Sequence, residues 1–112
     1  EQLPDLVRER GDLPTAFVSD DDIIATGAVR GFEAAGYAVP DDVSVIGFAN
    51  RPVAEYGSMA LTSVEVKKGV GLIAAKRLFQ RIENRNSGED DSIRMKIRIG
   101  TDLIIRDSTR KS

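Results

Sequence analysis

The sequence contains no cysteine, no histidine and no tryptophan, and aromatic residues make up only 5% of its 112 residues. Without Cys and His there is no thiol nucleophile, no imidazole base, no disulfide framework and no zinc site of the usual ligand types. A Ser-His-Asp or Cys-His enzyme is therefore excluded within this chain. Carboxylate chemistry, a cation held by oxygen ligands, or binding without chemistry remain. We expect no catalytic residue, no metal and no cofactor.

Long apolar runs and a strong charge of one sign are also missing. No run approaches the roughly 20 residues that a bilayer span needs, and 16 Lys and Arg against 18 Asp and Glu give a net charge of −2. This balance argues against a general nucleic-acid or membrane-surface binder. A hydrophobic content of 41% with 30% charged residues is ordinary for a globular chain. We expect no membrane partner, and the absence of Cys favours a reducing compartment.

Hydrophobic patterning predicts strands that alternate with helices. Residues 1–10 have the features of a helix tail that stops at a glycine. Apolar spacing of three and four predicts helices at 22–35 and at about 67–84. Three short apolar runs predict strands, and the middle one is typical of a strand covered on both faces. Those runs are 15–18, 43–48 and 61–66.

The last part of the chain has a different pattern. Residues 93–99 alternate apolar and basic side chains, which predicts an edge strand with Arg94, Lys96 and Arg98 facing solvent. We interpret these charges as a guard against edge-to-edge pairing rather than a phosphate track, because no aromatic residues are interleaved to stack bases. Leu103–Ile105 follow as a short strand. The predicted fold class is α/β, with a mostly parallel sheet flanked by helices.

Two polar groups follow the first two predicted strands. Ser19 to Asp22 come after the first strand, and Ala49, Asn50 and Arg51 come after the second. In parallel α/β sheets, ligands bind beyond the carboxyl ends of the strands. These loops are therefore the candidate binding site.

Three consecutive aspartates, Asp20 to Asp22, stand where the first strand gives way to a helix. We expect Asp22 to cap the helix N-terminus and Asp20 to be solvated. The local pattern allows two interpretations of Asp21. It either has no ligand role, or it faces the crevice and contacts ligand hydroxyls or a divalent cation.

Gly27 and Gly31 lie four residues apart within the first long helix, which indicates close packing against the sheet or against another chain. The loop after the second strand contains Tyr56 and Met59 with other apolar residues, which is unusual for a connection. An apolar patch of this kind suggests contact with a partner.

Several stretches together resemble the lactose-repressor/galactose-repressor family of bacterial transcription regulators. The most specific is Val39-Pro40-Asp41-Asp42-Val43-Ser44-Val45-Ile46-Gly47-Phe48. Pro14 to Val18, Asp21-Asp22, Gly27 to Arg30, Leu61 to Val64 and Leu103 to Thr109 continue the match in order. The resemblance covers nearly the whole chain.

The resemblance implies a periplasmic-binding-protein-like (type I) lobe that is incomplete. Residues 1–112 would be the C-terminal lobe of a cytoplasmic ligand-sensing domain, with the first lobe and a helix-turn-helix headpiece absent from this chain. Such regulators bind a small-molecule effector, usually a sugar or related metabolite, between two lobes. They act as homodimers, and the headpiece binds operator DNA. This chain would reach DNA only through that missing headpiece.

The resemblance also assigns roles to particular positions. Asp21 matches the family's effector-contacting Asn/Asp, and Ala49 stands where many members have an Asp that binds ligand hydroxyls. Either Asn50 contributes instead, or the ligand is not a typical sugar, or binding is weak. The predicted ligand-binding residues are Asp21, Asn50, Ala49 and Ser19. The predicted dimer-interface residues are Ile23, Ile24, Gly27, Tyr56 and Met59.

Two other readings belong to different functional classes. An extracytoplasmic solute-binding protein shares the same lobes, and the sequence upstream of Glu1 would separate the two by showing a signal peptide or a headpiece. A receiver-like or phosphatase-like domain would use the acidic cluster around Mg²⁺. That reading needs a further acidic or Lys partner at another strand end, where Ala49 and Val66 stand instead.

Overall fold

A computed structural model describes Glu9, residues 12–90 and residues 92–111. The chain divides into two compact units, each described here by itself. Unit 1 consists of Glu1–Glu65 and Asp102–Ser112, and unit 2 is Val66–Thr101. The helix tail predicted at residues 1–10 lies outside the described residues except for Glu9, which is helical. The assignment of residues 1–112 to one lobe stays a prediction.

Unit 1 is built on a four-stranded sheet, β1 (Ala16–Val18), β2 (Ser44–Phe48), β3 (Thr62–Glu65) and β4 (Asp102–Ile104). The strands lie side by side in chain order. β1, β2 and β3 run parallel, and β4 pairs antiparallel with β3. The prediction of a mostly parallel sheet in an α/β fold is confirmed. Because the first three strands run in the same direction, the loops that follow them leave from the same edge of the sheet.

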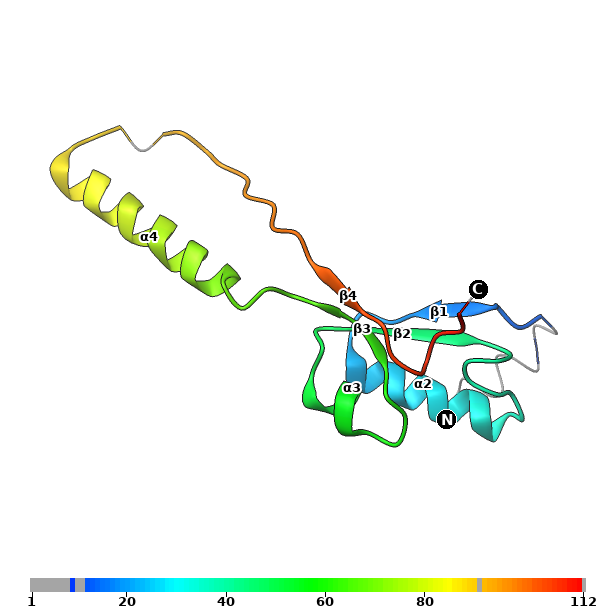
Figure 1. Cartoon of the computed structure of the whole chain (residues 1–112). Helices are drawn as coiled ribbons and strands as arrows, with labels where there is room; N and C mark the ends of the chain where they lie inside the picture. The colour runs from blue at the N-terminus through cyan, green and yellow to red at the C-terminus, as the bar shows by residue number, and fades with distance from the viewer. Residues whose placement is uncertain (1–8, 10–11, 91, 112) are drawn as a thin grey trace. The chain divides into compact units, whose positions relative to one another are not determined.

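Helix α2 (Asp22–Ala34) packs against one face of this sheet, as Figure 1 shows. Its apolar positions recur every three or four residues, so one stripe of the helix faces β2. Phe32 is fully buried and meets the Phe17 ring edge-on, with 5.8 Å between ring centroids. Gly36, at φ 91°, follows the end of the helix, close to the predicted end at residue 35. The buried apolar core consists of Ala25, Ala28, Val29, Phe32, Val39, Val43, Val45, Ala54 and Leu61.

The other face of β2 is less covered than expected. Val45 and Gly47 are buried under α2, whereas Ser44 and Ile46 are half-buried and Phe48 is exposed. The prediction that β2 is covered on both faces is wrong for the described residues. A continuous apolar run is typical of a strand covered on both faces, but it does not identify a segment of the chain that covers each face.

A short helix, α3 (Pro52–Tyr56), occupies the segment predicted to be a loop. Proline stands in its first turn, where the missing N–H costs nothing and the fixed φ suits a helix start. Its Ala54 is fully buried in the core. Five residues are too few to show a hydrophobic period, so no pattern in the sequence predicted this helix.

Unit 2 contains α4 (Val70–Ser87), predicted at 67–84, with Gly88 in the left-handed conformation at its C-terminus. None of its residues is buried, so the apolar stripe expected to face a core lies open in the described residues. With Met95, Ile97 and Ile99 it lines a hollow of about 380 Å³. In the part of the chain that the structure describes, no helix is both long and apolar enough to cross a bilayer.

The edge strand predicted at 93–99 is absent from the structure. Residues 92–101 have no strand assignment, and Ile93, Met95 and Ile97 are exposed. Alternation at period two specifies which side chains share a face, but a strand also needs a neighbour to pair with its backbone. Among the described residues nothing pairs with this segment. The described residues therefore give no support to the interpretation that Arg94, Lys96 and Arg98 protect a strand edge from pairing.

Candidate functional site

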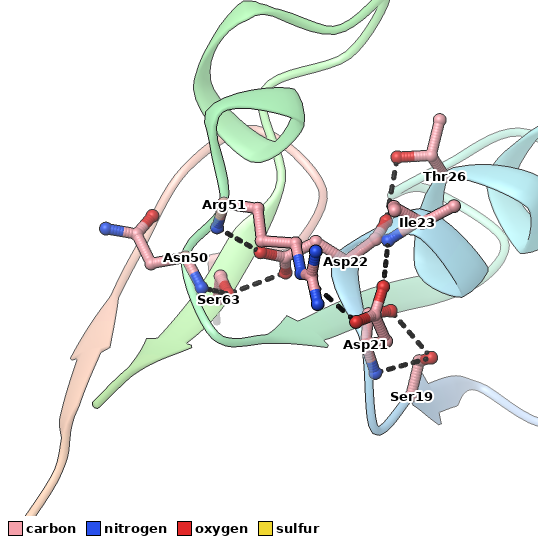
Figure 2. A network of polar contacts seen from close by, with 8 residues as sticks. All are labelled: Ser19, Asp21, Asp22, Ile23, Thr26, Asn50, Arg51 and Ser63. Atoms are coloured by element: carbon pink, nitrogen blue, oxygen red, sulfur yellow. Dashed lines mark hydrogen bonds and ion pairs between the residues drawn. The ribbon is translucent and has the colours of Figure 1, made fainter.

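The two loops nominated by the sequence meet at one edge of the sheet (Figure 2). One follows β1 and contains Ser19 to Asp22; the other follows β2 and contains Ala49 to Arg51. An ion pair joins them, with 3.2 Å between Arg51 Nε and Asp21 Oδ2. The side chains of this pair are 53% and 25% exposed, so the pair lies at the surface of the molecule. The pair is therefore open to contact from outside the two loops.

Asp21, not Asp22, caps helix α2. Its backbone is extended, and its Oδ1 accepts a hydrogen bond of 2.7 Å from the Ile23 N–H. A cap residue must lie just outside the helix so that its side chain can turn back to the first free N–H groups. Asp22 is already the first helical residue, which is why the prediction that it caps the helix is wrong. Asp21 thus has one oxygen on the helix and the other on Arg51.

Asp22 points into the protein and is fully buried. Its Oδ1 accepts 2.7 Å from the Ser63 hydroxyl, and its Oδ2 accepts 2.6 Å from the Arg51 N–H. A buried carboxylate is costly unless its oxygens are hydrogen-bonded, and here both are. Asp20 is exposed, as expected of a solvated residue. Three consecutive aspartates therefore have three different surroundings.

Ser19 is buried beside Asp21. Its hydroxyl donates to the Asp21 carbonyl oxygen at 2.9 Å and accepts from the Asp21 N–H at 3.3 Å. Its own N–H donates to the Ile46 carbonyl at 2.8 Å. These bonds fix the turn that presents Asp21. The hydroxyl predicted to contact the ligand directly is occupied with this local contact.

Asn50 has its amide engaged by other parts of unit 1. Its Oδ1 accepts 2.7 Å from Arg106 Nη2, and its Nδ2 donates to Glu65 Oε1 at 3.2 Å. Figure 2 shows the Asn50 side chain directed away from Asp21. The two loops are brought together, but the two side chains at the centre of the sequence hypothesis diverge. Contact of Asn50 with a ligand stays a prediction.

Ala49 is exposed and has a φ of 92°, and Asn50 follows it with a φ of 51°. Two successive residues with positive φ are rare when neither is glycine. The Ala49 N–H donates to the Val64 carbonyl at 2.9 Å, which ties the turn to β3. Ala49 contributes only a methyl group to this edge of the sheet.

The structure adds four residues that the sequence reasoning did not assign to the site. Arg51 completes the ion pair, and Ser63, Glu65 and Arg106 hold the β2–α3 turn from β3 and from the segment after β4. Arg51 stood in a nominated loop, so its position was a usable signal. The other three lie 13 to 56 residues from Asn50, and no local pattern relates them to it.

The residues predicted for a dimer interface are distributed unevenly. Ile23 and Ile24 on α2 are 60% and 56% exposed, and Tyr56 at the end of α3 is 80% exposed. Gly27 is also exposed, with open space above its Cα. Met59 is half-buried against the core, so less of it is open to a partner. α2 and α3 are in contact, so these side chains lie on neighbouring elements. Their role stays a prediction.

The acidic cluster does not converge on a cation position. Over Glu9, 12–90 and 92–111, no group of three or more His, Cys, Asp or Glu side chains could hold a metal ion. Asp21 bonds Ile23 and Arg51, whereas Asp22 turns inward to Ser63. The Mg²⁺-dependent reading therefore gains no support from the geometry.

Comparison with known families and structures gives a consistent result. The family model described as "periplasmic binding protein-like domain" matches residues 1–109 of this chain. The HTH-type transcriptional repressor PurR of Mannheimia succiniciproducens is 38% identical over 101 residues, which is 89% of this chain and 29% of that protein. The PurR repressor of Photobacterium profundum is 36% identical over 100 residues, 88% of this chain and 28% of that protein. The chain thus spans less than a third of the length of these relatives.

Solved structures share the fold. A protein assigned as a LacI transcriptional regulator from Bacillus cereus subsp. cytotoxis superposes with a TM-score of 0.80 at 31% identity, covering 98% of this chain and 39% of that one. A LacI family regulator from Lactobacillus casei with bound sucrose gives 0.62 at 26% identity, covering 96% and 37%. The lac repressor dimer bound to operator and the anti-inducer ONPF gives 0.72 at 21% identity, covering 96% and 36%.

Proposed function

Because this chain belongs to the periplasmic binding protein-like family, among the lactose-repressor/galactose-repressor regulators, we propose that it is the effector-sensing part of a bacterial transcription regulator. The observation that carries the proposal is the surface ion pair Asp21–Arg51 at the carboxyl ends of β1 and β2. Ligands of parallel α/β sheets bind at this edge. The relatives are repressors rather than enzymes, and we propose no catalysis for this chain.

We propose Asp21 and Arg51 as the principal effector contacts of this lobe. The Arg51 side chain is 53% exposed and contacts Asp21 through Nε, and its Nη groups carry further donors that could serve a ligand acceptor. Asp21 Oδ2 supplies an acceptor for a ligand hydroxyl. Ser19 and Asn50 support these contacts, Ser19 by fixing the Asp21 turn and Asn50 by fixing the turn before Arg51. Ala49 lines the same edge without a polar contact.

The effector we propose is a sugar or a related metabolite. The Lactobacillus casei regulator of the same fold holds sucrose, which supports this class. Ala49 removes the carboxylate that would make a charge-assisted hydrogen bond to a ligand hydroxyl, a bond worth about 1.5–3 kcal/mol. The Arg51 guanidinium shifts the preference toward a ligand with acceptor or anionic groups, such as a phosphorylated metabolite.

The mechanism is a population shift. An effector that binds one arrangement of two lobes better than another changes the balance between them by its differential affinity. In a homodimer this balance sets the spacing of two headpieces on operator DNA. Both the first lobe and the headpiece would lie outside the present chain, and the regulator would act in the cytoplasm.

The alternative is a lobe of an extracytoplasmic solute-binding protein, which uses the same edge of the sheet to bind a sugar. A signal peptide upstream of Glu1 would support that alternative, whereas a helix-turn-helix segment would support the regulator. The relatives with the highest identities reported above are HTH-type repressors, and this favours the regulator.

Isothermal titration of the full-length regulator with sucrose and with a panel of sugars and phosphorylated metabolites tests the proposal. We expect saturable binding of at least one compound, and we expect Asp21→Ala and Arg51→Ala each to weaken it about tenfold or more. Asp20→Ala is the matched control, because Asp20 is an exposed neighbour outside the ion pair. No heat from any compound, or binding that is indifferent to both site variants, would overturn the proposal.

A further inference from the structure

The turn from Ala49 to Arg51 has a conformation that its alanine does not favour. Ala49 and Asn50 both have positive φ, at 92° and 51°. Alanine rarely adopts a positive φ, whereas asparagine tolerates it, so the strain lies at Ala49 and persists only because surrounding contacts over-determine the turn. The cause of the turn's shape must therefore lie in other elements.

Backbone N–H groups of the turn are held one after another by side chains or backbone from outside it. Ala49 N–H donates to the Val64 carbonyl at 2.9 Å, and Asn50 N–H donates to the Ser63 hydroxyl at 3.0 Å. Arg51 N–H donates to Asp22 Oδ2 at 2.6 Å. The Ser63 hydroxyl in turn donates to Asp22 Oδ1 at 2.7 Å. Two of the three restraints therefore end on the carboxylate of Asp22.

The space around this carboxylate is filled to contact. Asp22 and Ser63 are fully buried, and a Cβ placed on Gly47 would overlap Asp22 Oδ1 and lie 3.2 Å from its Cγ. Gly47 has an ordinary φ, so its need for glycine is one of space and not of conformation. The N-terminus of α2, the end of β2 and the middle of β3 thus meet at one group. Figure 2 shows Asp22 at the centre of these contacts.

We propose that Asp22 is the positioning residue of the site: its buried carboxylate sets the backbone of Ala49–Arg51 and thereby directs the Arg51 guanidinium toward Asp21. The significance of this arrangement for ligand binding rests on the proposed function, whereas the positioning itself does not. The adjacent carboxylates of Asp21 and Asp22 have different contacts. Asp21 faces outward to the helix cap and Arg51, and Asp22 faces inward and holds the turn that carries Arg51.

Amide hydrogen exchange measured by NMR on the present chain tests the positioning directly. In Asp22→Ala we expect the Asn50 and Arg51 amides to exchange about tenfold faster or more, with amides in the middle of β2 unchanged. Asp22→Asn should restore most of the protection of Arg51, since its amide oxygen can still accept that bond and its NH₂ group can donate to the Ser63 hydroxyl. Asp20→Asn makes the same chemical change at the exposed neighbour and should have no effect.

Two further variants keep the test decisive if Asp22→Ala fails to fold. Gly47→Ala keeps the Asp22 carboxylate but forces it to move, because the added methyl group would overlap its Oδ1. Ser63→Ala removes only the link between the carboxylate and the Asn50 N–H. We expect Gly47→Ala to expose both turn amides and Ser63→Ala to expose mainly that of Asn50. Unchanged exchange at Asn50 and Arg51 in folded variants would overturn the proposal, as would loss of protection spread evenly over unit 1.

Titration of the same variants, made in the full-length regulator, with sucrose or with the compound that binds best in the metabolite panel separates this inference from the proposed function. Weaker binding by Asp22→Ala, together with faster exchange of the turn, supports both. Faster exchange of the turn in a protein that binds no compound leaves Asp22 as the positioning residue and overturns the proposed function. Normal binding and normal exchange in Asp22→Ala would overturn only the inference about Asp22.

Discussion

Ala49 combines two properties that point in opposite directions. It is an exposed alanine at φ 92°, a conformation in which glycine would have no strain, and it follows a strand end where ligands of this fold bind. Asn50 beside it has a side chain tied to Glu65 and Arg106. The partly exposed polar side chains that remain at this edge for a ligand are Asp21 and Arg51, whose Oδ2 and Nε atoms lie 3.2 Å apart.

The strain at Ala49 predicts a stabilising substitution. We expect Ala49→Gly to raise the free energy of unfolding by up to about 1 kcal/mol, because relief of the positive-φ strain exceeds the added entropy of the unfolded chain. Urea unfolding followed by circular dichroism measures the change. Ala34→Gly, on the exposed side of α2, is the matched control and should destabilise by about 0.5–1 kcal/mol. Equal destabilisation by both would show that Ala49 is unstrained.

The cap at Asp21 predicts a difference between neighbouring aspartates. Asp21→Ala should lower the free energy of unfolding by about 1 kcal/mol, since it leaves the Ile23 N–H without its acceptor. Loss of the partly exposed Arg51 pair adds little to this. Asp20→Ala should change the free energy by less than about 0.5 kcal/mol. The same urea experiment checks both, and a larger effect at Asp20 would contradict the capping assignment.

The two long helices have similar apolar spacing but different surroundings. α2 buries Ala25, Val29 and Phe32 against the sheet, whereas no residue of α4 is buried. Helix period specifies a face and leaves open what covers it. Most helical stability in proteins comes from tertiary packing of an apolar face, and α4 has no buried residue to supply it. The two elements should therefore differ in stability.

Hydrogen exchange should reveal this difference directly. At low protein concentration we expect the amides in the middle of α4 to be protected at least about tenfold less than those in the middle of α2. If α4 is equally protected, its apolar face is covered in solution, and the prediction is wrong. Protection of α4 that increases with protein concentration would identify a second copy of the chain as the cover.

The loop after α4 carries a pH-dependent contact. Hydrogen bonds from the side chain and backbone of Ser92 lower the pKa of Asp90 below its ordinary value. A lowered carboxyl pKa means that the contact contributes fully above the ordinary pKa and is lost as pH falls through the lowered one. We expect Ser92→Ala to raise the pKa of Asp90 toward its ordinary value, measured by carbon-13 NMR titration. An unchanged titration would show that Ser92 does not hold this carboxylate.

The net charge of −2 for the whole chain conceals a difference in charge between the two units. Val66–Thr101 contains nine Lys and Arg against four Asp and Glu, so its charge is positive, whereas the rest of the chain is strongly negative. Both units also expose apolar side chains, among them Ile24, Tyr56 and Ile105 in unit 1. Exposed apolar surface of this extent favours association with another protein surface.

We expect the chain to be a dimer or larger species in sedimentation analysis, with α2 and α3 in the contact. The paired substitution Ile24→Ser with Tyr56→Ser should weaken association about tenfold or more, because large apolar anchors contribute most of the binding energy of interfaces. Leu103→Ser with Ile105→Ser is the matched control on the exposed face of the sheet. Dissociation by the control pair and not by the first would place the interface elsewhere, and a wild-type monomer at high concentration would contradict association altogether.

By itself, the sequence determined the local framework of this protein. The spacing of apolar residues predicted β1, α2, β2, β3 and α4 within a few positions, because burial on one face imposes a period of two or 3.6 on the chain. The stretch from Val39 to Phe48 identified the family, and the absence of His and Cys excluded the main nucleophilic enzyme classes. The strand ends nominated the two loops that meet.

Only the tertiary structure decided which residue of those loops does what. Asp22 and its partners are 29 and 41 positions apart, and Asn50 and Arg106 are 56 apart, so no local period connects them. Whether Asp21 or Asp22 caps the helix depends on where the helix begins to within one residue, and propensity does not fix a boundary so closely. The predicted strand at 93–99 was wrong for a related reason: alternation needs a partner strand before it becomes a sheet.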